Sequence, residues 1–108
     1  MVRKKIYELQ NLGRLSDDVI DKYIIILEEI ESPVNFEEAK ILVGLFPDDT
    51  VDGCGVDWSL LHLFETVGET IGNYSEDYED LIELCPGDEW KSILKARLRN
   101  YKEEYGIN

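Results

Sequence analysis

Histidine and cysteine, the side chains most typical of nucleophilic catalysis and of transition-metal sites, are scarce in this sequence. His62 is the only histidine, and Cys54 lies eight residues before it, so the two residue types of a Cys–His nucleophile pair are present. Nothing in the sequence orients the base, and no glycine-rich oxyanion motif accompanies the pair. The chain also offers too few histidines and cysteines for a metal centre. We therefore expect no enzyme, and a His62 that hydrogen-bonds a neighbouring acid at the edge of the core.

The acidic segment 48–53 fits a calcium-binding loop only in part. An EF-hand loop places oxygen ligands at positions 1, 3 and 5, glycine at position 6 and a bidentate glutamate at position 12. Counted from Asp48, positions 1, 5 and 6 fit, but position 3 is Thr50 and position 12 is Ser59. Because the closing carboxylate is missing, we predict a solvated acidic turn without a metal. The sequence has no phosphate-binding loop or dinucleotide motif either, so no cofactor is expected.

Carboxylates dominate the charged residues. The 108-residue chain has 24 acids and 11 Lys or Arg, a net charge of −13. Residues 17–89 contain 21 of the acids but only Lys22 and Lys40 as bases. Such a segment repels nucleic-acid phosphates and anionic membrane surfaces, so neither is an expected partner. The charge therefore favours a cationic partner, and the alternative interpretation is that these acids only keep the surface soluble.

Apolar residues recur at helical spacing along most of the chain, and proline and glycine interrupt them. Asn35 followed by Glu38 has the pattern of a capping box. Gly13 ends the first helix, and the wide apolar stripe of residues 19–30 predicts a central second helix. We place Trp58 and Trp90 in the core. Helices are expected over residues 3–12, 16–32, 35–46, 57–67, 75–85 and 88–105.

These elements predict an all-α fold of five or six short antiparallel helices, either stacked hairpins of the HEAT type or a compact bundle. The length suits one domain over residues 1–108, with residues 1–14 as a peripheral helix. No apolar run approaches the ~20 residues of a membrane helix, and residues 1–8 lack the apolar core of a signal peptide. Cys54 and Cys85 are therefore expected as reduced thiols in the cytoplasm.

Three groups of residues resemble a helical family of bacterial immunity proteins, which are encoded beside polymorphic or contact-dependent toxins. The family has an acidic F-x-D-D turn, a W-S-L-[IL]-H-x-[IVF]-E helix and a closing E-W-x-x-[IL]-L-x-x-R-[IL]-x-N helix. This sequence has Phe-Pro-Asp-Asp at 46–49, Trp-Ser-Leu-Leu-His at 58–62 followed by Glu65, and matching residues at 89–100. The likeness spans roughly residues 40–101, and the Gly-Cys-Gly turn at 53–55 departs from it.

The resemblance implies a stoichiometric inhibitor that binds the basic C-terminal domain of a cognate toxin and occludes it or holds it inactive. Many such toxins are nucleases with basic clefts, which a polyanion could fill. We expect Tyr74 or Tyr78 to anchor the contact. An acidic helical-repeat adaptor that binds a basic protein unrelated to toxins is the alternative. The expected docking face consists of Asp48, Asp49, Asp52, Asp57, Glu65, Glu69, Tyr74, Glu76, Asp77, Tyr78, Glu79 and Asp80.

Overall fold

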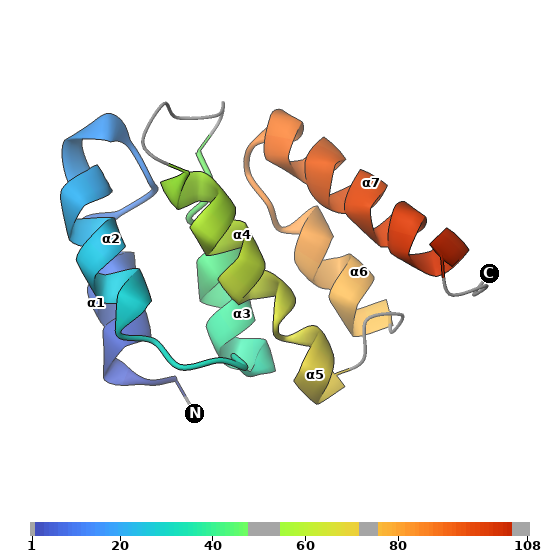
Figure 1. The fold of residues 1–108 in the computed structure, drawn as a ribbon, viewed down its shortest axis with the longest axis horizontal. Coiled ribbons are helices and arrows are strands. Elements are labelled where there is room, and N and C mark those ends of the chain that lie inside the picture. Colours follow the sequence, from blue (N-terminus) through green and yellow to red (C-terminus); the bar gives the residue numbers. More distant parts are fainter. Residues whose placement is uncertain (1, 48–54, 72–75, 105–108) are drawn as a thin grey trace.

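The computed structural model describes residues 2–47, 55–71 and 76–104, and throughout these ranges its regular structure is helical (Figure 1). The all-α prediction is confirmed. None of the helices in these ranges has the length and apolar character needed to cross a membrane. The elements are α1 (Lys4–Leu12), the short 3₁₀ helix η1 (Asp17–Val19), α2 (Ile20–Glu28), α3 (Phe36–Val43), α4 (Val56–Glu65), α5 (Gly68–Ile71), α6 (Glu76–Glu83) and α7 (Asp88–Glu104).

The helices form three stacked hairpins, α1/α2, α3/α4 and α6/α7. The first helices of the hairpins are neighbours in the order α1, α3, α6, and α2 lies beside α4 in the other layer. Figure 1 shows α1 behind α2 and α3 behind α4, with α7 at the opposite end of the stack from α2. In the described part of the chain, the first and third hairpins therefore each have one side without a neighbouring hairpin.

Local signals set several helix ends. Gly13 ends α1 with φ of 82°, a left-handed conformation that favours glycine. At the start of α3, the Asn35 side chain accepts the Glu38 N–H at 2.9 Å, and the Glu38 carboxylate accepts the Asn35 N–H at 3.1 Å. This confirms the predicted capping box. The helix expected to start at residue 57, with Asp57 as its cap, begins instead at Val56 after Gly55, and Asp57 lies within its first turn.

The isoleucine-rich helix occupies the edge of the stack and not its centre. Of the residues in α2, Tyr23 alone is fully buried, whereas Ile25 is 59 % exposed. The prediction of a central helix was wrong because a wide apolar stripe does not reveal how many neighbours the helix has. Among the described residues, α2 packs on α1 and α4 and has no neighbouring helix on its outer side.

Aromatic rings fill the core between the second and third hairpins. Trp90 is completely buried, as predicted, and stacks on Phe46 with ring centroids 5.3 Å apart. Phe64 lies edge-on to Phe46 at 6.2 Å. Trp58 contacts the edge of this cluster, 5.4 Å from Trp90, but is 42 % exposed. Its predicted core position was wrong, because its ring covers the margin of the cluster from outside.

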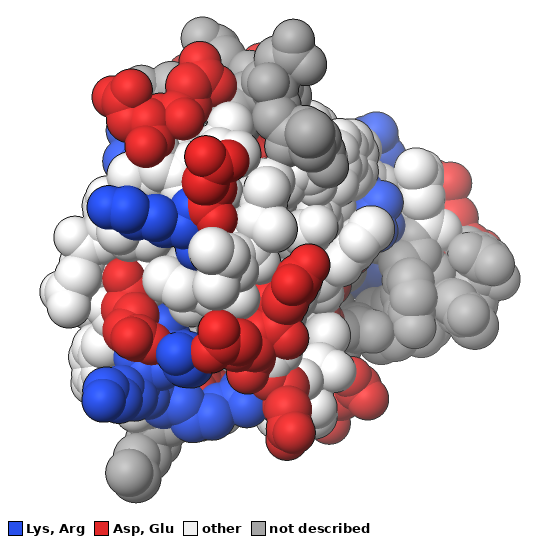
Figure 2. All heavy atoms as spheres, turned by 60° about the vertical axis from the view of Figure 1, so that its left-hand side comes forward, with Lys and Arg blue, Asp and Glu red and all other residues white. Residues whose placement is uncertain are grey.

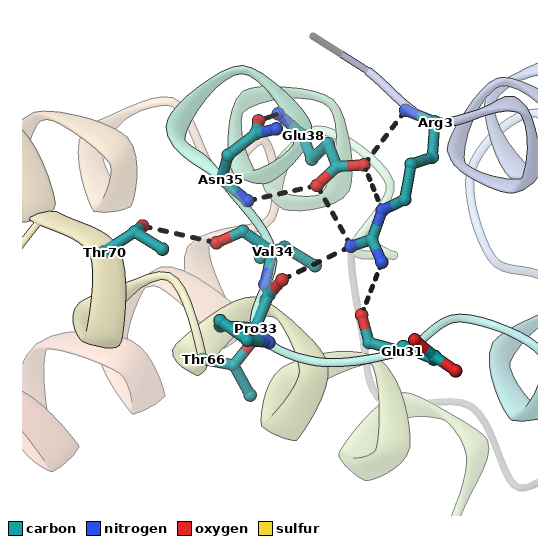
Figure 3. A network of polar contacts seen from close by, with 8 residues as sticks. All are labelled: Arg3, Glu31, Pro33, Val34, Asn35, Glu38, Thr66 and Thr70. Carbon is teal, nitrogen blue, oxygen red and sulfur yellow. Dashed lines mark hydrogen bonds and ion pairs between the residues drawn. The ribbon is translucent and has the colours of Figure 1, made fainter.

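The N-terminal segment is tied to the centre of the stack through Glu38 (Figure 3). Glu38 is 1 % exposed, and its carboxylate accepts Nε of Arg3 at 2.7 Å, Nη2 at 3.1 Å and the Arg3 backbone N–H at 3.0 Å. Arg3 also donates to the carbonyl oxygen of Glu31 at 2.7 Å. One guanidinium therefore neutralises a buried carboxylate and holds the segment between α2 and α3. Because α1 also buries Ile6 and Leu9, the first hairpin is part of the core.

Candidate protein-binding surface

The structure separates the twelve residues of the expected docking face into groups with different surroundings. Asp48, Asp49, Asp52 and Tyr74 lie outside the described residues. The other eight are on α4, α5 and α6.

Two of these eight are buried and do not form an exposed surface. Asp57 is 3 % exposed and its carboxylate accepts the N–H of Trp58 at 2.9 Å. Tyr78 is 5 % exposed and packs beside Phe64, with ring centroids 5.9 Å apart. Burial raises the pKa of its hydroxyl well above the ordinary value. The inward side of α6 takes Tyr78 into the core, so the expectation of an exposed tyrosine anchor there is corrected.

Two further acids form ion pairs within the chain. Glu65 accepts two hydrogen bonds from Arg97, at 2.7 and 2.8 Å, so its charge joins α4 to α7. Glu79 accepts Nζ of Lys102 at 3.1 Å. A partner would have to compete with these bases for either carboxylate.

The remaining four acids, Glu69, Glu76, Asp77 and Asp80, are exposed, and none forms an ion pair with another described residue. Three of them lie on the outer side of α6. The two sides of this helix differ in charge, because ion pairs neutralise the acids on its edge toward α7. There, Glu83 pairs with Lys95 at 2.8 Å, and the hydrogen bond from Lys95 lowers the pKa of Glu83.

An exposed leucine lies beside these acids. Leu84, directly after α6, is 54 % exposed. At about 100° per residue, positions 77, 80 and 84 fall on one side of a helix. We call Asp77, Asp80 and Leu84 the α6 stripe. Sequence reasoning missed Leu84 because it follows the core residues Leu81 and Ile82, although its spacing from Asp77 and Asp80 indicates the outer side.

Acids are not confined to α6. Figure 2 shows the side formed by the first hairpin, where acidic and basic side chains lie among uncharged ones. Asp17, Asp18, Asp21 and Glu28 are exposed on η1 and α2. The expectation of one concentrated anionic face is therefore corrected: exposed carboxylates are present on the first and third hairpins.

His62 is exposed on α4, and its ring lies 6.4 Å from that of Trp58. Within the described part of the chain, no hydrogen bond joins His62 to an acid, which differs from our expectation. Cys54, its partner in the hypothetical nucleophile pair, lies outside the described residues. The described residues contain no group of three His, Cys, Asp or Glu side chains arranged to hold a metal ion.

A shallow hollow lies between the start of α1 and the end of α2. Two of its three cations are already engaged, since Lys5 pairs with Glu29 at 2.6 Å and Arg3 with Glu38 at 2.7 Å, which leaves the exposed Lys4. It therefore offers little free positive charge for an anion. The residues that line it are Arg3, Lys4, Lys5, Glu29, Ile30 and Glu31.

Comparison of the chain with protein-family models, curated proteins and solved structures found no match in any of the three.

Proposed function

We propose that this chain is an immunity-type inhibitor, which binds a cationic bacterial toxin domain in a stoichiometric complex. The α6 stripe is the observation that carries this proposal. It combines two exposed carboxylates, free of ion pairs within the described chain, with a half-exposed leucine beside them. Protein interfaces commonly combine an apolar anchor, which loses its contact with water, and a polar rim.

The charges suit a basic partner in two ways. A surface rich in carboxylates attracts a cationic protein from a distance and raises the association rate by ~10–10³-fold at low salt. At short range, Asp77 and Asp80 are available to pair with lysine or arginine, because the bases of α7 engage Glu79 and Glu83 instead. The partner's charges would therefore meet carboxylates that need not first break an internal ion pair.

The toxin assignment rests on the resemblance of residues 40–101 to the immunity family. Toxins of such systems include nucleases whose clefts are basic because they bind nucleic-acid phosphates. An acidic protein of this kind can block such a cleft directly, or bind nearby and hold the toxin inactive.

An acidic adaptor for a basic protein other than a toxin is the second candidate. The stacking of α1, α3 and α6 in one layer favours it, because helical-repeat proteins use such stacks to bind other proteins. The neighbouring gene separates the two functions: an immunity protein is encoded directly after a large toxin gene.

The test is calorimetric titration of this chain with the toxin domain encoded by the adjacent gene. We expect a 1:1 complex, weakened about 10-fold or more by Asp77→Lys with Asp80→Lys, and weakened also by Leu84→Ala. The control is Glu89→Lys with Glu103→Lys, which makes the same change in net charge on exposed positions of α7. Absence of a complex would contradict the proposed function. Equal weakening by both charge reversals would contradict a specific role for α6.

A further inference from the structure

The outer side of α2 is an unpartnered helix face at one end of the stack. Within the described chain, α2 packs against α1 and α4 only on its inner side. Ile25 points away from these contacts and, at 59 % exposure, is the most exposed of the large hydrophobic residues described. Tyr7 on α1, the other helix of this hairpin, is also 48 % exposed.

The residues three and four positions from Ile25 on its helix are three acids, Asp21, Glu28 and Glu29, and one base, Lys22. Asp21 and Glu28 lie four residues before and three residues after it, the spacings that put side chains on one side of a helix. Asp17 and Asp18 continue the acidic character at the start of the helix, and Lys22 is the one base among these residues. Glu29 is the acid of this region that an internal base neutralises, through its 2.6 Å ion pair with Lys5.

We infer that this face, centred on Ile25 with Asp18, Asp21 and Glu28 around it, is a second docking surface for a cationic protein with an apolar pocket. The inference rests on the proposed function and adds a contact on the first hairpin. Charge complementarity selects the occupant. A second copy that met the same face across a twofold axis would bring these acids against their own equivalents, which is unfavourable.

Trp58 is another large exposed side chain on this layer of helices, and its position is explained by contacts within the chain. Its ring contacts Trp90 at 5.4 Å, and the guanidinium of Arg97 lies 5.9 Å from its ring centroid. The described part of the chain shows no comparable contact for Ile25. The α2 face is therefore the better candidate for a surface completed by a partner.

The decisive variant is Ile25→Asp, because it separates the two contributions to binding. It adds an acid to an acidic face, so long-range attraction to a cationic partner increases, while the apolar anchor is lost. If Ile25 anchors the contact, affinity for the adjacent-gene toxin domain falls about 10-fold or more despite the added charge. Gln10→Glu, an exposed position on α1, adds the same charge to the same hairpin without removing an apolar side chain and should leave affinity nearly unchanged.

Calorimetry with these variants and with Leu84→Asp distinguishes this inference from the proposed function. Thermal unfolding of each variant checks that it is folded, and Ile25→Ala repeats the anchor test without a charge. Weaker binding by both Ile25 variants, with Gln10→Glu unaffected, supports the α2 surface. Unchanged or tighter binding by Ile25→Asp, with Leu84→Asp weakened, overturns the α2 surface while the proposed function stands. No binding by the unmodified chain contradicts both.

Discussion

Arg97 on α7 and Glu65 on α4 form a two-point ion pair. Nε and Nη2 of Arg97 donate to the two carboxylate oxygens of Glu65, at 2.8 and 2.7 Å. The same guanidinium lies 5.9 Å from the ring centroid of Trp58, so it joins both ends of α4 to the third hairpin. Trp58 contacts Trp90, and Glu65 contacts Arg97. In each pair the residue of α7 lies 32 positions after the residue of α4 in the sequence, so the start of α4 faces the start of α7. The two helices therefore run in the same direction, as Figure 1 shows.

We expect this pair to contribute modestly to stability. Glu65 and Arg97 are 25 % and 39 % exposed, so solvent screens their attraction, while the two-point geometry strengthens it. A double-mutant cycle with Glu65→Gln and Arg97→Met, measured by urea unfolding, should give a coupling energy of about 0.5–1 kcal/mol. The coupling should decrease in 1 M NaCl. A coupling near zero at low salt would mean that packing alone joins α4 to α7.

The ion pair between Arg3 and Glu38 should matter more, because Glu38 is almost completely buried. Arg3→Ala leaves a buried carboxylate with only the hydrogen bonds from backbone N–H groups, and we expect a loss of about 2 kcal/mol in the free energy of unfolding. Lys4→Ala is the control, since Lys4 is exposed on the same segment. Hydrogen exchange should show the lost protection mainly in the first hairpin and at the start of α3. Uniform loss across all helices would contradict a local tether.

The ion pair between Arg3 and Glu38 also predicts how the free energy of unfolding depends on pH. Burial by itself would raise the pKa of Glu38, but hydrogen bonds from Arg3 and Asn35, and the charge of Arg3, lower it below its ordinary value overall. The folded chain thus binds fewer protons at this site than the unfolded chain. The stabilisation is complete above the unfolded pKa of ~4.3 and is lost as pH falls through the folded pKa. Between pH 5 and pH 3, Glu38→Gln should therefore lose less stability than the unmodified chain, as measured by urea unfolding at each pH.

Sequence reasoning succeeded where neighbouring residues alone determine the structure. The capping box at Asn35 and Glu38 needs four consecutive residues, and the end of α1 needs one glycine with positive φ. The second helix was harder. The helix expected over residues 16–32 is shorter in the structure: η1 precedes α2, and α2 ends at Glu28, five residues before Pro33. Its apolar stripe was evident, but whether one or two hairpins would cover it depends on tertiary packing.

The candidate surface was less predictable for the same reason. Asp57 and Tyr78 carry the residue types expected of a docking face, yet helix orientation turns both inward. Glu65 is accessible from α4, but a base 32 positions away pairs with it. In contrast, Leu84 and Ile25 have the residue type expected of a core and lie outside. Exposure in these cases follows from which sides of α2 and α6 remain without neighbours, and this is a property of the whole stack.

The two tryptophans offer a matched comparison of buried and half-exposed aromatic packing. Trp90→Ala removes a completely buried ring that contacts Phe46 and Trp58, and we expect a loss of about 3–5 kcal/mol in the free energy of unfolding. Trp58→Ala removes a ring that is 42 % exposed and should cost about 1 kcal/mol. Both are measured by urea unfolding followed by circular dichroism. Equal losses would contradict the position of Trp58 at the margin of the core.

Cys85 should react slowly with thiol reagents in the folded chain. Its side chain is buried, and its sulfur lies 3.7 Å from the carbonyl oxygen of Gly87. Burial raises the pKa of the thiol above its ordinary value, so little reactive thiolate forms at pH 8. In a Cys54→Ser background, a thiol reagent such as DTNB should label Cys85 far more slowly than in the urea-unfolded chain.

Adding Arg97→Met should change this rate little if Cys85 is exposed by local opening near the end of α6. If exposure requires global unfolding, the rate should increase exponentially with the lost stability, about 10-fold for each 1.4 kcal/mol. Labelling of the folded chain at the unfolded rate would contradict a buried Cys85.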